Sequence, residues 1–137
     1  MSDGMLFVDA RTEARHVREH TVDELRDLYR EVRDFMRLVE IAKRMDQRTA
    51  ETTYTQYGHS RFQELSRMFR PINQKLKYID SEAMRRSRNW ILESFSNALT
   101  VKRKASLVAK MSIVVSNLHA IMENIQGIGV DIQIKEI

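Results

Sequence analysis

The side chains best suited to chemistry in this sequence are the basic residues between positions 61 and 110. This segment holds twelve Lys or Arg residues and four Asp or Glu residues, whereas residues 1–60 hold ten bases and twelve acids. Arg outnumbers Lys in the whole chain by 16 to seven. Because an Arg guanidinium can bind a phosphate or a carboxylate through two parallel hydrogen bonds, this distribution indicates an anionic partner.

Eleven of these bases form a predicted nucleic-acid-binding set, and the sequence pI of about 9.6 fits the basic character that such binding needs. Tyr54, Tyr57, Tyr78 and Trp90 lie near them in the sequence and could stack on unpaired nucleic-acid bases. The set comprises Arg61, Arg67, Arg70, Lys75, Lys77, Arg85, Arg86, Arg88, Lys102, Arg103 and Lys104. The same pattern is equally compatible with a solvated surface, with Tyr78 and Trp90 at the edge of the core.

A metal site is a second chemical possibility, because His16 and His20 are four residues apart and would share one face of a helix. Zinc needs three or four converging ligands, and the sequence defines no third one. His59 and His119 are isolated, and His119 borders an apolar stripe, where we expect it to be partly buried. We therefore predict neither a metal nor any other cofactor.

Sequence motifs typical of enzymes are not found. The chain has no Gly-rich phosphate loop, no nucleophile elbow and no His-Glu-x-x-His motif. It lacks the two Glu-x-x-His motifs of di-iron bundles as well, since Glu13 and His16 form its only one. It also has no Cys, which excludes disulfides and thiol chemistry and fits a reducing compartment. We predict a non-enzymatic cytoplasmic protein with no membrane segment, because residues 1–10 lack the bases of a secretory signal and no apolar run could span a bilayer.

Residues 105–126 are predicted to form the central helix, with Lys110 and Glu123 as their only charged residues. Their apolar residues follow a seven-residue repeat that forms a wide stripe along one helix face. This stripe comprises Leu107, Val108, Met111, Val114, Val115, Leu118, Ile121, Met122 and Ile125. A second face carries small residues, namely Ala105, Ala109, Ser112 and Ser116. Small side chains allow a neighbouring helix to approach closely, so we expect contacts on more than one side of this helix.

A first helix is predicted to begin at a capping box formed by Thr21 and Glu24 and to end near residue 48. Its exposed face alternates Arg and acidic residues at spacings of three and four, which predicts weak surface ion pairs. Residues 49–60 break the helical period, and Gly58 indicates a turn. The apolar face of this first helix is expected to include Val22.

Two more helices are predicted between residues 60 and 100. A capping box at Ser60 starts the second helix, and Pro71 inside it should kink or split the helix. Asp80 or Ser81 caps the third helix. The apolar faces of these two helices are expected to include Met68 and Leu92. The apolar stripe then changes phase near residues 100–104, which predicts a turn before the central helix.

Short β segments are predicted at both ends of the chain. Residues 128–136 alternate apolar and polar side chains near a helix stop at Gly127 and Gly129, and residues 5–8 form an apolar run. A lone strand cannot satisfy its own backbone hydrogen bonds, so the two segments would pair within one chain or exchange between subunits.

The pattern as a whole predicts an all-α, antiparallel four-helix bundle with β segments at its termini, forming a single domain over residues 1–137. The predicted function is a basic subunit of a nucleoprotein complex that binds nucleic-acid phosphates. The alternative is an oligomeric assembly or adaptor protein that acts through protein–protein contacts and terminal strand exchange. We expect a homo-oligomer in either case.

Overall fold

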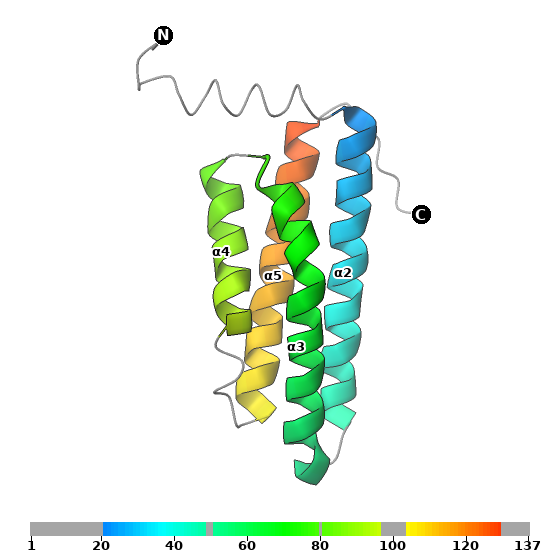
Figure 1. Cartoon of the computed structure of the whole chain (residues 1–137), viewed down its shortest axis with the longest axis vertical. Coiled ribbons are helices and arrows are strands. Elements are labelled where there is room, and N and C mark those ends of the chain that lie inside the picture. Colours follow the sequence, from blue (N-terminus) through cyan, green and yellow to red (C-terminus); the bar gives the residue numbers. More distant parts are fainter. Residues whose placement is uncertain (1–20, 49–50, 80, 97–103, 130–137) are drawn as a thin grey trace.

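The computed structural model describes residues 21–48, 51–79, 81–96 and 104–129 (Figure 1). These ranges form four helices, α2 (Val22–Arg48), α3 (Glu51–Leu76), α4 (Glu82–Ser96) and α5 (Lys104–Ile128). Successive helices run in opposite directions, and α5 returns to pack against α2 (Figure 1). The helices α3 and α5 face each other diagonally. The predicted all-α, antiparallel four-helix bundle is therefore confirmed for the described residues, which contain no strand.

The helix α2 begins at the predicted capping box. The backbone N–H of Thr21 donates to Glu24 Oε1 at 2.7 Å, and the N–H of Glu24 donates to Thr21 Oγ1 at 3.1 Å. Two N–H groups at the helix start thus gain partners. On the exposed face, Arg26 pairs with Asp23 at 2.9 Å, as the charge spacing predicts. Val22 was expected to be buried but is exposed in the first helical turn.

The helix α3 is longer than the sequence predicts. It begins at Glu51 and continues through Gly58, so the predicted turn at Gly58 and the predicted helix start at Ser60 are both wrong. A single Gly in a helix costs about 1 kcal/mol, which cooperative helix formation tolerates. The predicted split at Pro71 is also wrong, because α3 runs on to Leu76. Arg67, whose carbonyl loses its usual N–H partner at Pro71, is exposed, so water can hydrate that carbonyl. A bend at Pro71 stays a prediction.

The helices α4 and α5 are separate, as the change of phase predicts. Ser81 caps α4 by accepting a hydrogen bond from the N–H of Met84 at 3.1 Å. The helix α5 includes Gly127 and ends at Ile128, within the predicted stop at Gly127 and Gly129, and the N–H of Gly129 still donates to the carbonyl of Ile125 at 3.1 Å. Residue 128 is therefore helical and not part of a β segment. The other residues of the two predicted β segments, 5–8 and 130–136, lie outside the described ranges.

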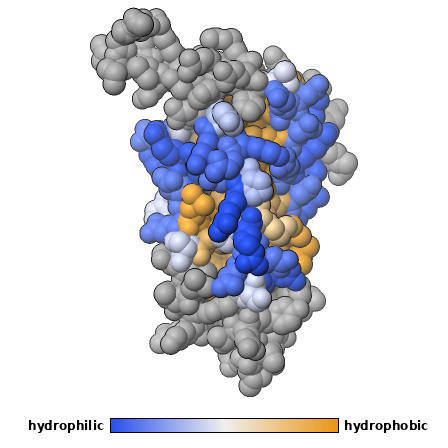
Figure 2. Space-filling model, in the orientation of Figure 1, coloured by the Kyte–Doolittle hydropathy of each residue, from blue (hydrophilic) through white to orange (hydrophobic). Residues whose placement is uncertain are grey.

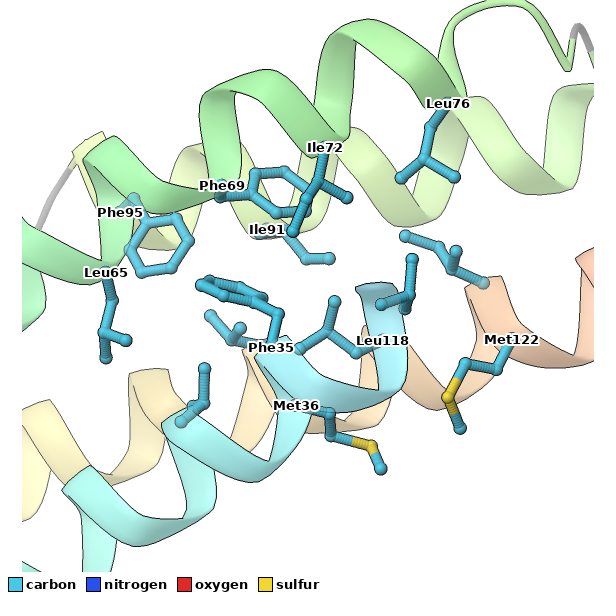
Figure 3. Close-up of a cluster of buried hydrophobic side chains, with 14 of the residues drawn as sticks. Phe35, Met36, Leu65, Phe69, Ile72, Leu76, Ile91, Phe95, Leu118 and Met122 are labelled. Carbon is cyan, nitrogen blue, oxygen red and sulfur yellow. The ribbon is translucent and has the colours of Figure 1, made fainter. Parts of the chain in front are cut away.

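The core is centred on Phe side chains from three helices (Figure 3). Phe95 of α4 lies 6.4 Å from Phe35 of α2, 6.1 Å from Phe69 of α3 and 4.9 Å from Phe62 of α3, measured between ring centroids. The predicted stripe of α5 completes this core, since Leu107, Met111, Val114, Leu118, Ile121, Met122 and Ile125 are buried. Met68 and Leu92 were expected to join it, but both are exposed.

The central position of α5 is confirmed by its contacts with both α2 and α4. Its small residues Ala109, Ser112 and Ser116 are exposed, although Ser112 Oγ accepts a hydrogen bond from Lys43 Nζ of α2 at 3.3 Å. The side chain of Ala105 is not among those described. None of the four described helices contains an apolar stretch long enough to cross a lipid bilayer.

Candidate nucleic-acid interface

The outer side of α3 carries a row of polar and basic side chains. The helix buries Phe62, Leu65, Phe69, Ile72 and Leu76, which leaves the opposite side to solvent. Five exposed residues recur there at spacings of three and four, and these are Gln63, Arg67, Arg70, Gln74 and Lys77. The N–H of Lys77 donates to the carbonyl of Asn73 at 3.1 Å, so this residue keeps the helical register beyond Leu76.

A contact between α3 and α4 indicates that Arg85 of α4 lies near this row. Arg88 of α4 is half-buried, and its Nη1 donates to Oδ1 of the buried Asn73 on α3 at 3.3 Å. This side of α4 therefore faces α3. Arg85 lies one helical turn earlier on the same side and is exposed.

We call Arg67, Arg70, Lys77 and Arg85 together the basic face. None of the four forms an ion pair with another described residue. Figure 2 views the molecule from the side of α3 and shows a hydrophilic band over this helix, with hydrophobic surface on both flanks. The basic face thus presents four positive charges to solvent.

Other bases of the predicted set are neutralised by acidic partners. Lys75 Nζ lies 2.6 Å from Glu31 Oε2 on α2, across the seam between α2 and α3. Arg61 pairs with Glu64 at 3.0 Å, and Arg86 pairs with Glu82 at 3.3 Å. These ion pairs are exposed and weak in energy, but each places a carboxylate where a phosphate would have to bind.

Among the predicted bases 102–104, only the backbone of Lys104 is described. Lys102 and Arg103 lie outside the described residues, and Lys104 is described only as the first residue of α5. The start of α5 lies at the opposite end of the bundle from the α3–α4 turn (Figure 1). The fifteen residues of α4 separate these ends by about 22 Å. The predicted set is therefore spread over the bundle, because antiparallel helices carry successive turns to opposite ends.

Two of the aromatic residues near the bases in the sequence, Tyr78 and Trp90, line other surfaces of the structure. Tyr78 lines a pocket of about 330 Å³ with Leu28, Lys75 and three acidic residues of α2, which are Glu24, Asp27 and Glu31. Trp90 lines a shallow groove of about 430 Å³ with four residues of α5, which are Ser112, Ile113, Ser116 and Asn117. The side chains of Tyr54 and Tyr57 are not among those described.

The histidines give no support to a metal site. His119 is exposed, so the expectation of partial burial is wrong, because α5 packs through a different side. Among the described residues, no three His, Asp or Glu side chains are placed to hold a metal ion. His16, His20 and the side chain of His59 lie outside the described set.

Part of the basic face follows from the sequence, because a hairpin of the second and third predicted helices would bring Lys75, Lys77, Arg85 and Arg86 to one end of the bundle. The row on α3 could have been found from its spacing, since positions 63, 67, 70, 74 and 77 share one helix side. Sequence analysis did not predict that Lys75 pairs with Glu31, because this ion pair depends on the packing of α3 against α2. No protein-family model matches the chain, and neither a curated protein nor a solved structure is significantly similar to it. The chemistry of this surface therefore has to be argued from its own geometry.

Proposed function

We propose that this protein is a non-enzymatic subunit of a nucleoprotein complex and binds nucleic-acid phosphates through its basic face. The observation that carries the proposal is the contrast between neighbouring bases. Arg67, Arg70, Lys77 and Arg85 share one exposed surface and have no acidic partner among the described residues, whereas Lys75, Arg61 and Arg86 are each paired with a carboxylate.

The physical basis is the release of counterions from the phosphate backbone. Each phosphate that a Lys or Arg neutralises contributes about −0.9 to the slope of log affinity against log salt for duplex DNA. Four contacts at the basic face would give a slope of about −3.6. Such contacts position a protein on nucleic acid but read no base sequence, so we expect similar affinity for unrelated sequences.

The test is fluorescence anisotropy of a labelled duplex titrated with the protein at several salt concentrations. A variant with Arg67→Gln, Arg70→Gln, Lys77→Gln and Arg85→Gln should lose binding on the order of tenfold or more at low salt, with a much shallower salt slope. A matched control changes Arg37→Gln, Arg44→Gln, Arg61→Gln and Arg86→Gln. It removes the same number of charges from other surfaces and should retain most of the affinity.

Two results would count against the proposal. One is the absence of binding by the unmodified protein at low salt. The other is an equal loss in both variants, which would mean that only the net charge matters and that no particular surface binds.

We propose, as a second candidate, an assembly role in which two copies of the chain meet through the face between α4 and α5. Trp90 and Ile113 project there beside the small residues Ser112 and Ser116. A two-fold interface must be complementary to itself, so it needs a projecting group and a shallow surface on the same face. No charged residue is exposed on α5 between Ser106 and Ala120, which favours a protein neighbour over an ionic one.

Sedimentation measured over a range of concentrations tests this second candidate. We expect a dimer that dissociates in the Trp90→Ala, Ile113→Ser variant and persists in Met68→Ser, a control for an exposed apolar residue on α3. A monomer at the highest concentration would remove the candidate. Exchange of the terminal segments between subunits stays a prediction that this test does not address.

A further inference from the structure

We infer that the basic face fits the paired backbone of a nucleic-acid duplex and does not fit an unpaired strand. The inference rests on the proposed function and adds the form of nucleic acid that is bound. It follows from where the aromatic rings lie, from the arrangement of the charges and from the polar residues between them.

No aromatic ring of the described residues lies on the basic face. Proteins that bind single strands combine a basic surface with aromatic side chains, and each stacked base contributes about 1–3 kcal/mol. Here the four described Phe rings are buried, and Tyr29 is packed against the core. Tyr78 lines the pocket beside the acidic residues of α2, and Trp90 lies between α4 and α5. An unpaired strand on the basic face would therefore find phosphate partners but no described platform for its bases.

The arrangement of the charges favours a dense and rigid set of phosphates. Arg67 and Arg70 are one helical turn apart, and Lys77 lies two turns further along the same helix side. This row spans about 15 Å along α3, and Arg85 adds a second line of charge from α4. A duplex carries a phosphate charge for about every 1.7 Å of its axis and releases more counterions per contact than a single strand does. A fixed row of cations gains more from the duplex for this reason.

The uncharged members of the row support the same conclusion. Gln63 and Gln74 share the outer side of α3 with the basic residues and are exposed. Side-chain amides donate hydrogen bonds to phosphate and sugar oxygens, which are the contacts that fix a protein on a duplex without reading its bases. The α3 surface thus offers five backbone-binding side chains in register along one helix.

A titration with two readouts tests the inference. Trp90 is the only Trp in the chain, so its emission reports on stacking at that ring. Labelled duplex and single-stranded DNA with the same number of phosphates are each titrated with the full chain, and anisotropy and Trp emission are recorded together. We expect duplex affinity on the order of tenfold higher at low salt, with Trp90 emission unchanged. The slope of log affinity against log salt should be about −3.6 for the duplex and about −2.8 for the single strand.

Two variants complete the design. The Gln63→Ala, Gln74→Ala variant should bind duplex several-fold more weakly, and the Trp90→Phe variant should bind both forms as the unmodified chain does. Equal or tighter binding of the single strand, or quenching of Trp90 on binding, would overturn the inference and leave the proposed function intact. Failure of the unmodified chain to bind either form at low salt would overturn both.

Discussion

Lys75 and Lys77 are two residues apart, yet only Lys77 keeps its positive charge available to a partner. Lys75 points across the α2–α3 seam to Glu31, from which it is separated by 44 residues in the sequence. Lys77 lies on the outer side of α3 without a described acidic neighbour. Phosphate affinity depends on a base that is not already neutralised. Lys75 therefore pairs within the protein, whereas Lys77 stays exposed without a described ion pair, although both are lysines.

At this scale we predict that Thr21→Ala lowers the free energy of unfolding by about 1 kcal/mol. The change removes the side chain that accepts from the N–H of Glu24 and the reciprocal geometry of the capping box. Urea denaturation followed by circular dichroism measures the effect. Ser60→Ala is the matched control, because Ser60 lies within α3 and caps nothing there, so its effect should stay within about 0.5 kcal/mol. A loss at Ser60 as large as that at Thr21 would contradict the observed start of α3.

At the scale of the element, α3 shows how tertiary packing overrides local helix breakers. Gly58 and Pro71 both lie inside it. The buried side chains of α3, from Phe62 to Leu76, form one continuous apolar face against the other helices. Burying such a face is worth about 1.5–3 kcal/mol for each large side chain, so the face as a whole outweighs the cost of either breaker. Continuity of α3 keeps Arg67, Arg70 and Lys77 in one row.

We predict that Pro71→Ala raises the free energy of unfolding by about 1–3 kcal/mol. Alanine restores the N–H that can donate to the carbonyl of Arg67, and Pro71 is exposed, so its removal leaves no cavity. The gain is reduced because Pro also restricts the unfolded chain. Thermal and urea denaturation measure the change. Gln74→Ala, at an exposed position one turn later, should shift stability by less than about 0.5 kcal/mol. Destabilisation by Pro71→Ala would instead mean that the packing of α3 requires a bend at this residue.

At the scale of the whole molecule, the aromatic cluster connects three of the four helices. Phe95 contacts rings from both α2 and α3, and α5 covers the cluster with Leu118 and its neighbours (Figure 3). Trp90 lies only five residues before Phe95 on the same helix, yet half of its surface is exposed. The larger ring therefore contributes less to the core than the smaller one.

We predict that Phe95→Ala lowers the free energy of unfolding by about 3–5 kcal/mol, because it opens a cavity between α2, α3 and α4. Trp90→Ala should lower it by less than about 1.5 kcal/mol, since water already reaches the ring. Urea denaturation measures both changes, at a protein concentration at which the oligomeric state is known. A greater loss for Trp90→Ala would indicate that this residue is buried in an assembly, as the second candidate function proposes.

Much of the helical architecture is determined by the sequence alone. The capping box at Thr21, the cap at Ser81 and the heptad stripe of residues 105–126 all have the predicted roles in the structure. Periodicity and capping are local properties, because hydrogen bonds and side-chain faces within a helix depend on residues three or four positions apart. The antiparallel order of the four described helices follows from these local signals and from the short connections.

Only the tertiary structure decided which side chains remain exposed between the helices. The apolar pattern could not distinguish Met68 and Leu92 from core residues, because both lie at the edge of a buried stripe. Their exposure depends on how each helix is rotated against its neighbours. The same rotation directs Lys75 to Glu31, turns Trp90 towards α5 and joins Arg88 of α4 to Asn73 of α3. A basic sequence segment thus becomes a smaller basic face, because neutralisation and proximity are set by residues far apart in the chain.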